Sequence, residues 1–178
     1  MSRSSTQRNM RDLTISAVCL ALCMVLPFLV GQLPEVARAI SPMHIPVLIA
    51  GFAVGPLYAA IIGFIAPLLR FMIFGMPQMP NGVAMAFELA TYGAVAGILY
   101  GVLPKKIPFI YISLISAMLV GRIVWGISRA LIQMGTADSF TFALFIAGGF
   151  TNAIPGIILH IAIIPPIVMA LKKARLLE

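Results

Sequence analysis

The sequence predicts an all-α integral membrane protein with six transmembrane helices and both termini in the cytoplasm. Of its 178 residues, 61% are hydrophobic and only 10% are charged, and the mean hydropathy is +1.08. A water-soluble fold could not bury that much apolar surface, so we expect the lipid bilayer to be the solvent of this chain. A helical crossing needs ~20 residues, so the length suits about six spans. We therefore expect a single transmembrane domain over 1–178, with a short cytoplasmic tail at 1–11.

Six apolar runs define the expected spans, and Pro and Gly residues mark most of the breaks between them. The runs are 13–31, 43–55, 57–74, 82–103, 107–133 and 142–171. The second run is too short to cross a bilayer alone, so we expect it to be tilted or shielded by its neighbours. The last run is long for one straight crossing. Asn152, Pro155 and Gly156 could break or kink it, which leaves open whether it is one helix or two.

Loop charge decides between five and six spans, because residues 43–74 could also form one long helix. Basic residues precede the first run, separate the fourth from the fifth and follow the last. They are Arg3, Arg8, Arg11, Lys105, Lys106, Lys172, Lys173 and Arg175. Only six spans place all of them on one side, which the positive-inside rule assigns to the cytoplasm. The net charge of +7 is therefore interpreted as loop and membrane-surface charge, and no nucleic-acid partner is expected.

Several ionisable residues lie inside the expected spans, where a charge is costly and usually functional. They are His44, Arg70, Glu88, Arg122, Arg129 and His160. The topology places all of them except His160 in the outer half of the membrane or near mid-depth. Three arginines face one glutamate, so the spans carry a positive excess that needs an anion. A carboxylate ligand would supply it, because a planar guanidinium binds a carboxylate at two points.

Helical spacing groups these residues into two polar faces. The first face holds Arg122, Trp125 and Arg129, at i, i+3 and i+7. The second holds Glu88, Thr91 and Tyr92. Gly121 and Gly126, beside the first face, would let another group approach the helix backbone. The two faces together predict a polar site between the fourth and fifth spans.

Structural interpretations of the charged residues remain open. Arg70 and Arg129 could extend to the outer headgroups, and Glu88 could pair with Arg122 only to hold two helices together. Arg122 fits this interpretation least well, because it lies too deep to reach the headgroups easily.

Three further polar residues are ambiguous. His44, at the start of the second run, could contact a ligand or be an interfacial residue. Asn152 could cap a helix break or contact a ligand, whereas His160 is interpreted as a packing residue. Four methionines, at 72, 76, 79 and 85, surround the third loop and would suit a flexible lid.

The sequence contains no motif that indicates an enzyme. It has no Walker-type phosphate loop, no Ser/His/Asp arrangement and no His-Glu-x-x-His. Cys19 and Cys23 are interpreted as packing residues, and no spacing indicates metal ligands, so neither a metal nor a cofactor is expected. An intramembrane enzyme would have to use Glu88 with His44, and the arginines would then have no purpose.

Several motifs resemble the substrate-binding S components of energy-coupling factor (ECF) transporters, and the likeness covers nearly the whole chain. They are SPMHIPVL at 41–48 followed by Ala50-Gly51 and Gly55-Pro56, AMAFELATYG at 84–93, GRIVWG at 121–126 and NAIPG at 152–156. The resemblance implies an S-component-like helical bundle in a prokaryotic cytoplasmic membrane. It also implies high-affinity binding of a scarce water-soluble vitamin from outside, and docking onto one membrane scaffold subunit and two ATPase subunits.

The resemblance also implies where ligand and partners bind. The ligand site of the family lies in the outer half, closed by loops that correspond to 32–42 and 75–81. The residues expected to bind substrate are His44, Arg70, Glu88, Tyr92, Arg122, Trp125, Arg129 and Asn152. Ala17 and Ala21 match the alanine-x-x-x-alanine motif by which S components dock onto the scaffold.

The charge of the residues inside the spans indicates which substrate to expect. S components of this branch serve pantothenate, pyridoxine-type compounds, hydroxymethylpyrimidine, folate and queuosine precursors. The positive excess favours a carboxylate, so pantothenate is the predicted substrate. A neutral aromatic vitamin stacking on Trp125 or Tyr92 is the alternative. A membrane assembly subunit, whose buried charges only fix helix packing, is the alternative of another class.

Overall fold

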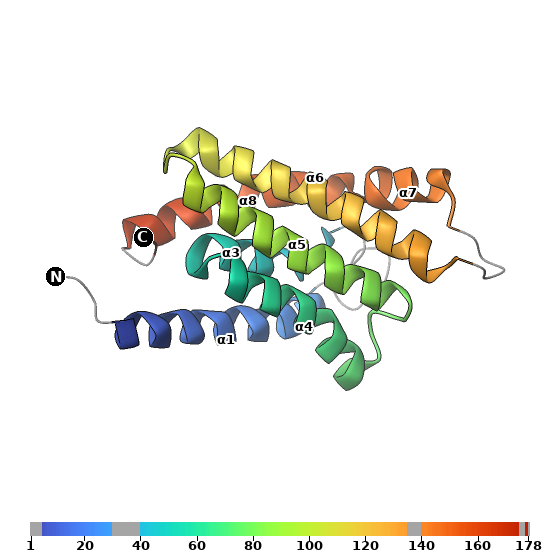
Figure 1. Ribbon diagram of the computed structural model, residues 1–178, viewed down its shortest axis with the longest axis horizontal. Coiled ribbons are helices and arrows are strands. Elements are labelled where there is room, and N and C mark those ends of the chain that lie inside the picture. Colours follow the sequence, from blue (N-terminus) through green and yellow to red (C-terminus); the bar gives the residue numbers. More distant parts are fainter. Residues whose placement is uncertain (1–4, 30–39, 135–139, 175–176, 178) are drawn as a thin grey trace.

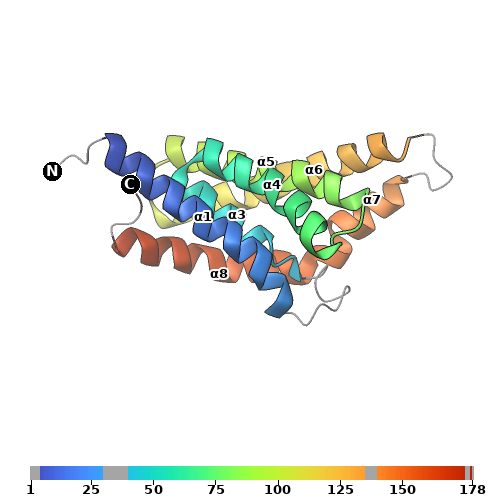
Figure 2. The ribbon, with the colours of Figure 1, turned by 90° about the horizontal axis from the view of Figure 1, so that it is seen from below.

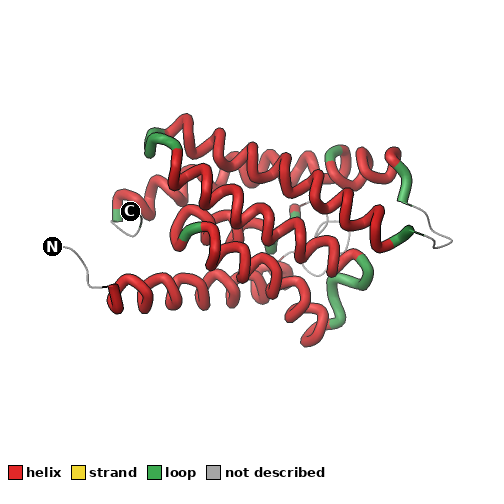
Figure 3. Tube along the Cα trace, in the orientation of Figure 1, coloured by secondary structure: helices red, strands yellow, loops and turns green. Residues whose placement is uncertain are grey.

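The computed structural model is a bundle of helices (Figure 3), and it describes residues 5–29, 40–134, 140–174 and 177. Its elements are α1 (Ser5–Leu29), α3 (His44–Val54), α4 (Pro56–Phe74), α5 (Asn81–Val102), α6 (Ile107–Ile132), α7 (Phe142–Gly149), a 3-10 turn (Thr151–Ala153) and α8 (Ile154–Lys173). Large apolar side chains such as Leu13, Leu57 and Ile123 point outward. A bundle that presents such residues to its surroundings suits a lipid environment.

Successive helices alternate in direction along the bundle, with α7 and α8 together making the last passage (Figures 1 and 2). The start of α1 and the end of α8 lie at one end of the bundle (Figures 1 and 2). We call it the basic end because it carries Arg11, Lys105 and Lys172. At this end Lys172 Nζ donates to the Lys105 carbonyl over 2.7 Å, and Arg11 donates to the Ala53 carbonyl over 3.1 Å. The opposite end is called the cavity end. This alternation is the one that the expected topology requires.

Five segments of the described chain are long and apolar enough to cross a membrane: four single helices and the combined segment Phe142–Lys173. The sixth apolar helix, α3, is too short for that criterion. The expectation of six spans thus corresponds to five long candidates and one short helix. The first helix begins at Ser5, whereas the sequence predicted a tail at 1–11. Most of that polar stretch is therefore helical.

The break between the second and third runs lies at Gly55-Pro56, so residues 43–74 are not one long helix. Gly55 has a φ of +84°, in the left-handed region that glycine adopts without strain. Pro56 follows at the start of α4, where a missing backbone N–H is harmless. The two helices are therefore antiparallel neighbours, as loop charge predicted.

The short helix α3 lies inside the bundle. Its 11 residues give a length of about 16 Å at 1.5 Å per residue, roughly half of the ~30 Å hydrocarbon core. Eight of these residues are buried, because α1, α4, α5 and α8 all pack against α3. The shielding expected for a short span is confirmed, and His44 consequently begins a helix within the protein interior.

Close contact between α4 and α5 depends on glycine. A Cβ atom at Gly63 would overlap the backbone of Leu89, and one at Gly93 would lie 2.7 Å from the backbone of Ala59. Small residues at such points let two helix backbones approach closely. The α4–α5 pair therefore forms a tight unit that fixes the position of the polar residues on α5.

The last apolar run is two helices rather than one. α7 ends at Gly149 and α8 begins at Ile154, with a 3-10 turn between them that contains Asn152. Pro155 lies in the first turn of α8, a position that proline tolerates well. The sequence left open whether this run is one helix or two, and the structure shows two. The break lies at Asn152, shortly before Pro155.

Candidate functional site

A cavity of about 700 Å³ lies at the cavity end of the bundle. Its walls come from the last turns of α1, α4 and α6, the first turns of α3 and α5, and α7 with the turn after it. Antiparallel helices bring exactly those turns to the same end, so the site is a direct result of the topology. Pockets for small molecules commonly enclose about 300–1,000 Å³, so the cavity has room for a vitamin-sized ligand.

Most residues predicted to bind substrate lie around this cavity. Its walls include His44, Arg70, Glu88, Arg122, Trp125, Arg129 and Asn152. Tyr92 is the exception, because it lies behind Glu88 and reaches the cavity only through that carboxylate. The structure thus brings together residues from α3, α4, α5, α6 and the turn before α8, and their role in binding remains a prediction.

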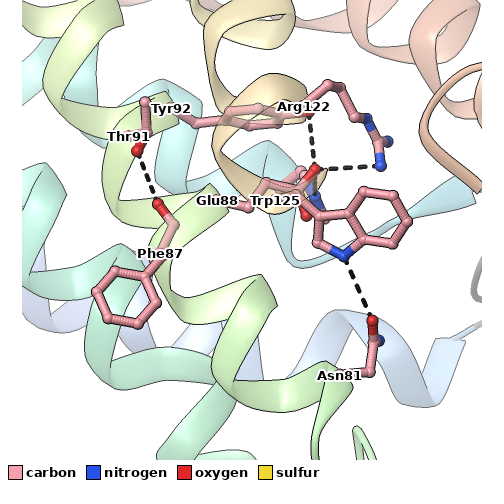
Figure 4. Close-up of polar contacts among 8 residues, drawn as sticks. Asn81, Phe87, Glu88, Thr91, Tyr92, Arg122 and Trp125 are labelled. Atoms are coloured by element: carbon pink, nitrogen blue, oxygen red, sulfur yellow. Dashed lines mark hydrogen bonds and ion pairs between the residues drawn. The ribbon is translucent and has the colours of Figure 1, made fainter. Parts of the chain in front are cut away.

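The floor of the cavity is built around the buried carboxylate of Glu88, which is 2% exposed. Its Oε1 accepts a hydrogen bond from the Tyr92 hydroxyl at 3.1 Å and pairs with the Arg122 guanidinium at 3.1 Å (Figure 4). His44 Nε2 lies 3.5 Å from the same oxygen. The ion pair that was one structural interpretation of Glu88 and Arg122 is therefore present.

A second histidine supports the floor from behind. His160, 1% exposed, stacks on His44 with ring centroids 5.9 Å apart and an angle of 18° between the rings. It does not line the cavity, which agrees with its interpretation as a packing residue. The floor is thus formed by α3, α5 and α6 and backed by α8.

Trp125 forms part of one wall and is held on both sides. Its indole Nε1 donates to Asn81 Oδ1 over 3.3 Å (Figure 4), and its ring meets the Phe140 ring edge to face at 5.6 Å. A Cβ at Gly148 would lie 2.8 Å from the indole, so α7 packs directly on the ring. Trp125 is consequently a rigid aromatic wall.

Thr91 was expected on the same polar face as Glu88, but it does not join the site. Its hydroxyl donates to the carbonyl of Phe87 at 2.8 Å, one turn back in α5 (Figure 4). A threonine in a helix often satisfies its hydroxyl in this way. Helical spacing predicted that Thr91 and Tyr92 share one polar face. In the structure only Tyr92 contacts Glu88.

Arg70 is buried and is held by protein groups. It is 5% exposed, its Nη1 donates to the Met24 carbonyl over 2.6 Å, and its guanidinium lies 4.8 Å from the centroid of the Phe28 ring. Phe74 contributes a second ring at 5.1 Å. Arg70 therefore ties α4 to α1 and does not extend to the headgroup region.

Arg129 has fewer partners. Its guanidinium lies 5.7 Å from the centroid of the Phe140 ring, and its Nε is buried with no hydrogen-bond partner among the described residues. A cation–π contact of this kind does not neutralise the charge. Arg129 thus keeps its positive charge at the cavity wall.

The charge balance of the cavity wall is positive. Among the residues that the structure describes, Glu88 is the only carboxylate that lines the cavity, whereas Arg70, Arg122 and Arg129 all line it. Glu88 pairs with Arg122, so the excess lies on the other two arginines. The same part of the chain contains no group of three or more His, Cys, Asp or Glu residues that could hold a metal ion.

Comparison with models of known protein families identifies the family of this chain. The family described as ECF transporter, substrate-specific component, matches residues 11–168. The chain belongs to this family. No curated protein and no solved structure matches the chain.

Family membership establishes the general role of the cavity. ECF substrate-specific components bind small substrates and work with an energy-coupling module, and they are not enzymes. This chain is accordingly a substrate-binding subunit of an ECF transporter and a multi-pass membrane protein. The hypothesis of an intramembrane enzyme is thereby set aside, and so is that of a non-transporting assembly subunit.

The structure describes only part of the two loops that were expected to close the ligand site. Of the loop at 32–42, residues 32–39 lie outside the described part of the chain, while Ser41 and Pro42 line the cavity. Of the loop at 75–81, the cavity is lined by Met76, Pro77, Gln78 and Asn81. Two of the four methionines noted in the sequence, Met76 and Met85, line it as well.

Sequence analysis missed the aromatic partners of the arginines in this ECF subunit. Phe28 and Phe74 flank Arg70, and Phe140 lies against Arg129. Phenylalanine is common in any membrane helix, so no local pattern distinguishes these rings. Asn81 was also missed, although a lone amide at the start of an apolar run could have indicated it.

The expected docking residues lie on the outer face of α1. Ala17 and Ala21 are both exposed, and Val18 and Leu22 beside them are 54% and 40% exposed. Cys19 and Cys23 point the other way and are buried free thiols, as their packing interpretation predicts. The ECF subunit thus presents a smooth apolar face on its first helix.

Proposed function

We propose that this ECF substrate-specific component binds a small vitamin-type acid in the cavity, with pantothenate as the best candidate. The observation that carries the proposal is the charge of the cavity wall, where three arginines and a single carboxylate line the space among the described residues. Anionic ligands are favoured where guanidinium groups lack carboxylate partners. The substrate-binding residues are the predicted ones, with Tyr92 acting through Glu88.

A neutral aromatic vitamin of the pyridoxine type is the second candidate. The rigid indole of Trp125 supports it, because an aromatic ligand could stack on that wall. Among the described residues this candidate supplies no anion for Arg129, so we rank it second.

Release of the ligand to the inside requires partners. We propose that the outer face of α1, centred on Ala17 and Ala21, docks onto the membrane scaffold subunit of an energy-coupling module that carries two ATPase subunits. Small side chains in this position let a partner helix approach closely. Their exposure, beside buried Cys19 and Cys23, supports the proposal.

Thermal unfolding of the detergent-purified protein against a panel of water-soluble vitamins tests the substrate. A ligand that binds only the folded state adds ~2.7 kcal/mol at a free concentration one hundred times its Kd. We expect pantothenate to raise the Tm and pyridoxine to leave it unchanged.

The other outcomes discriminate between the alternatives. A shift with pyridoxine but not with pantothenate would support a neutral aromatic ligand and contradict the charge argument. No shift with any vitamin, in protein shown to be folded by size-exclusion chromatography, would contradict the whole proposal.

A further inference from the structure

The two ends of the cavity differ in chemistry, and this difference bears on how a ligand lies in it. Arg122 and Arg129 stand seven residues apart on α6, which separates them by about 10 Å along the helix axis. Trp125 lies between them and lines the same cavity. The floor at Arg122 and the outer wall at Arg129 can therefore contact opposite ends of one small molecule.

The floor is close to electrically neutral. Arg122 pairs with Glu88 at 3.1 Å, and the described contacts of that carboxylate all fall on Oε1. Arg122 Nε and His44 Nδ1 are buried without hydrogen-bond partners among the described residues, while His44 Nε2 faces Glu88 Oε1 at 3.5 Å. A buried pair with spare donors and an acceptor favours a group that can both donate and accept, such as a hydroxyl or an amide.

The outer wall is cationic. Arg129 lies against the Phe140 ring, and no described carboxylate other than Glu88 lines the cavity. Its Nε is also buried without a hydrogen-bond partner in the described chain. Charge-assisted hydrogen bonds to an anion would satisfy both the charge and the unused donor.

Arg70 is less available than Arg129 for this purpose. Its Nη1 is occupied by the Met24 carbonyl at 2.6 Å, and its guanidinium is flanked by Phe28 and Phe74. A ligand that took Arg70 would have to break its link with α1. Within the described part of the chain, Arg129 is therefore the guanidinium with the fewer contacts to give up when an anion binds.

We propose that the ligand is a small acid bound in one direction, with its carboxylate at Arg129 and a neutral hydroxyl- or amide-bearing end on the Glu88–Arg122 floor. This inference rests on the proposed function and adds to it the orientation and the residue that selects the acid. It makes Arg129, and not the deeper Arg122, the residue that distinguishes an acid from its neutral analogue.

A matched ligand pair tests the orientation. Pantothenate and panthenol share their hydroxyl and amide end, and panthenol carries a primary alcohol in place of the carboxylate. Affinities of both compounds are measured by isothermal titration calorimetry with the wild-type protein, Arg129→Gln, Arg129→Lys and Glu88→Gln. Lys173→Gln, at the basic end and exposed, serves as the charge-matched control.

We expect the wild-type protein to prefer the acid, and Arg129→Gln to weaken pantothenate about tenfold or more while changing panthenol little, since a charge-assisted hydrogen bond is lost. Arg129→Lys should retain part of the preference. Glu88→Gln should weaken both compounds, because their shared end contacts the floor. Lys173→Gln should change neither affinity.

Opposite results would overturn the orientation while leaving the proposed function intact. If the carboxylate lies at Arg122, Glu88→Gln frees that arginine and strengthens pantothenate binding, and Arg129→Gln leaves the acid-to-alcohol ratio unchanged. If neither compound binds the wild-type protein, the proposed substrate and the orientation both fail. The unliganded Tm of each variant shows that a loss of affinity is not a loss of folding.

Discussion

At the scale of single residues, the position of Glu88 depends on close packing of α5 against Gly121 on α6. The Tyr92 ring, whose hydroxyl donates to Glu88, packs against α6 at Gly121, where an added Cβ would overlap the ring. The sequence predicted that a group would approach the backbone at Gly121, and this is confirmed. Which group approaches could not be predicted, because the register between two helices is set by packing along their whole length.

Substitution of this glycine should damage both the fold and the site. We expect Gly121→Ala to displace Tyr92 and to lower the free energy of unfolding by about 1–3 kcal/mol, the usual cost of overpacking. Thermal unfolding in detergent measures the loss. Pantothenate affinity should fall as well, because Glu88 loses the Tyr92 hydrogen bond.

Gly101→Ala is the matched control for that substitution. Gly101 lies in the last turn of α5, and an added Cβ there meets nothing within 4 Å. Alanine is the better helix former, so we expect no loss and a gain of up to about 1 kcal/mol. Equal destabilisation by the two substitutions would show that the Tyr92 contact does not constrain Gly121.

At the scale of helices, the sequence predicted the breaks better than the lengths. The third, fourth and fifth runs agree with α4, α5 and α6 to within one residue at each end, because prolines or glycines flank them. α1 instead begins at Ser5, before its apolar run. Hydropathy detects the part of a helix that lipid would cover, and about the first two turns, which are polar, lie outside that signal.

The charged residues of the site could also be recognised from the sequence. A charge within an apolar run has few explanations, so Arg70, Glu88 and Arg122 stood out in the sequence. The aromatic partner that α1 supplies did not, because Phe28 is far from Arg70 in the sequence and only the folded arrangement brings the two together.

The outer face of α1 offers a test of docking. We expect Ala21→Trp to reduce co-purification of the scaffold and ATPase subunits, because a large ring would prevent close approach of a partner helix. Ligand-induced stabilisation of the isolated subunit should persist, since Ala21 points away from the cavity. Quantitative immunoblotting after affinity purification from native membranes measures the yield of the complex.

Ala143→Trp is the control, because Ala143 is also exposed but lies on α7. It should leave co-purification unchanged. A normal yield of complex with Ala21→Trp would show that α1 docks elsewhere or not at all.

At the scale of the whole molecule, the alternation of helix direction places the three basic clusters together. Lys105 and Lys172 are in contact at the basic end, and the cavity lies at the other. With the positive-inside rule, this polarity predicts that the cavity faces the outside. Uptake of a substrate from outside, as proposed, would require that orientation.

Reporter fusions test the orientation. We expect a C-terminal green fluorescent protein fusion to fluoresce and a C-terminal alkaline phosphatase fusion to be inactive, since six crossings return the chain to the cytoplasm. Phosphatase fused after Gln78, at the cavity end, should be active. An active phosphatase at the C-terminus would indicate an odd number of crossings.

The shortness of α3 has an electrostatic consequence. Because this helix begins at His44 on the cavity floor, the Glu88–Arg122 ion pair borders a space that either water or ligand must fill. Replacing water by a ligand lowers the local effective dielectric constant, and the attraction between two charges rises in inverse proportion. Occupancy should therefore tighten the link between α5 and α6, so that the loaded protein is a stiffer body than the empty one.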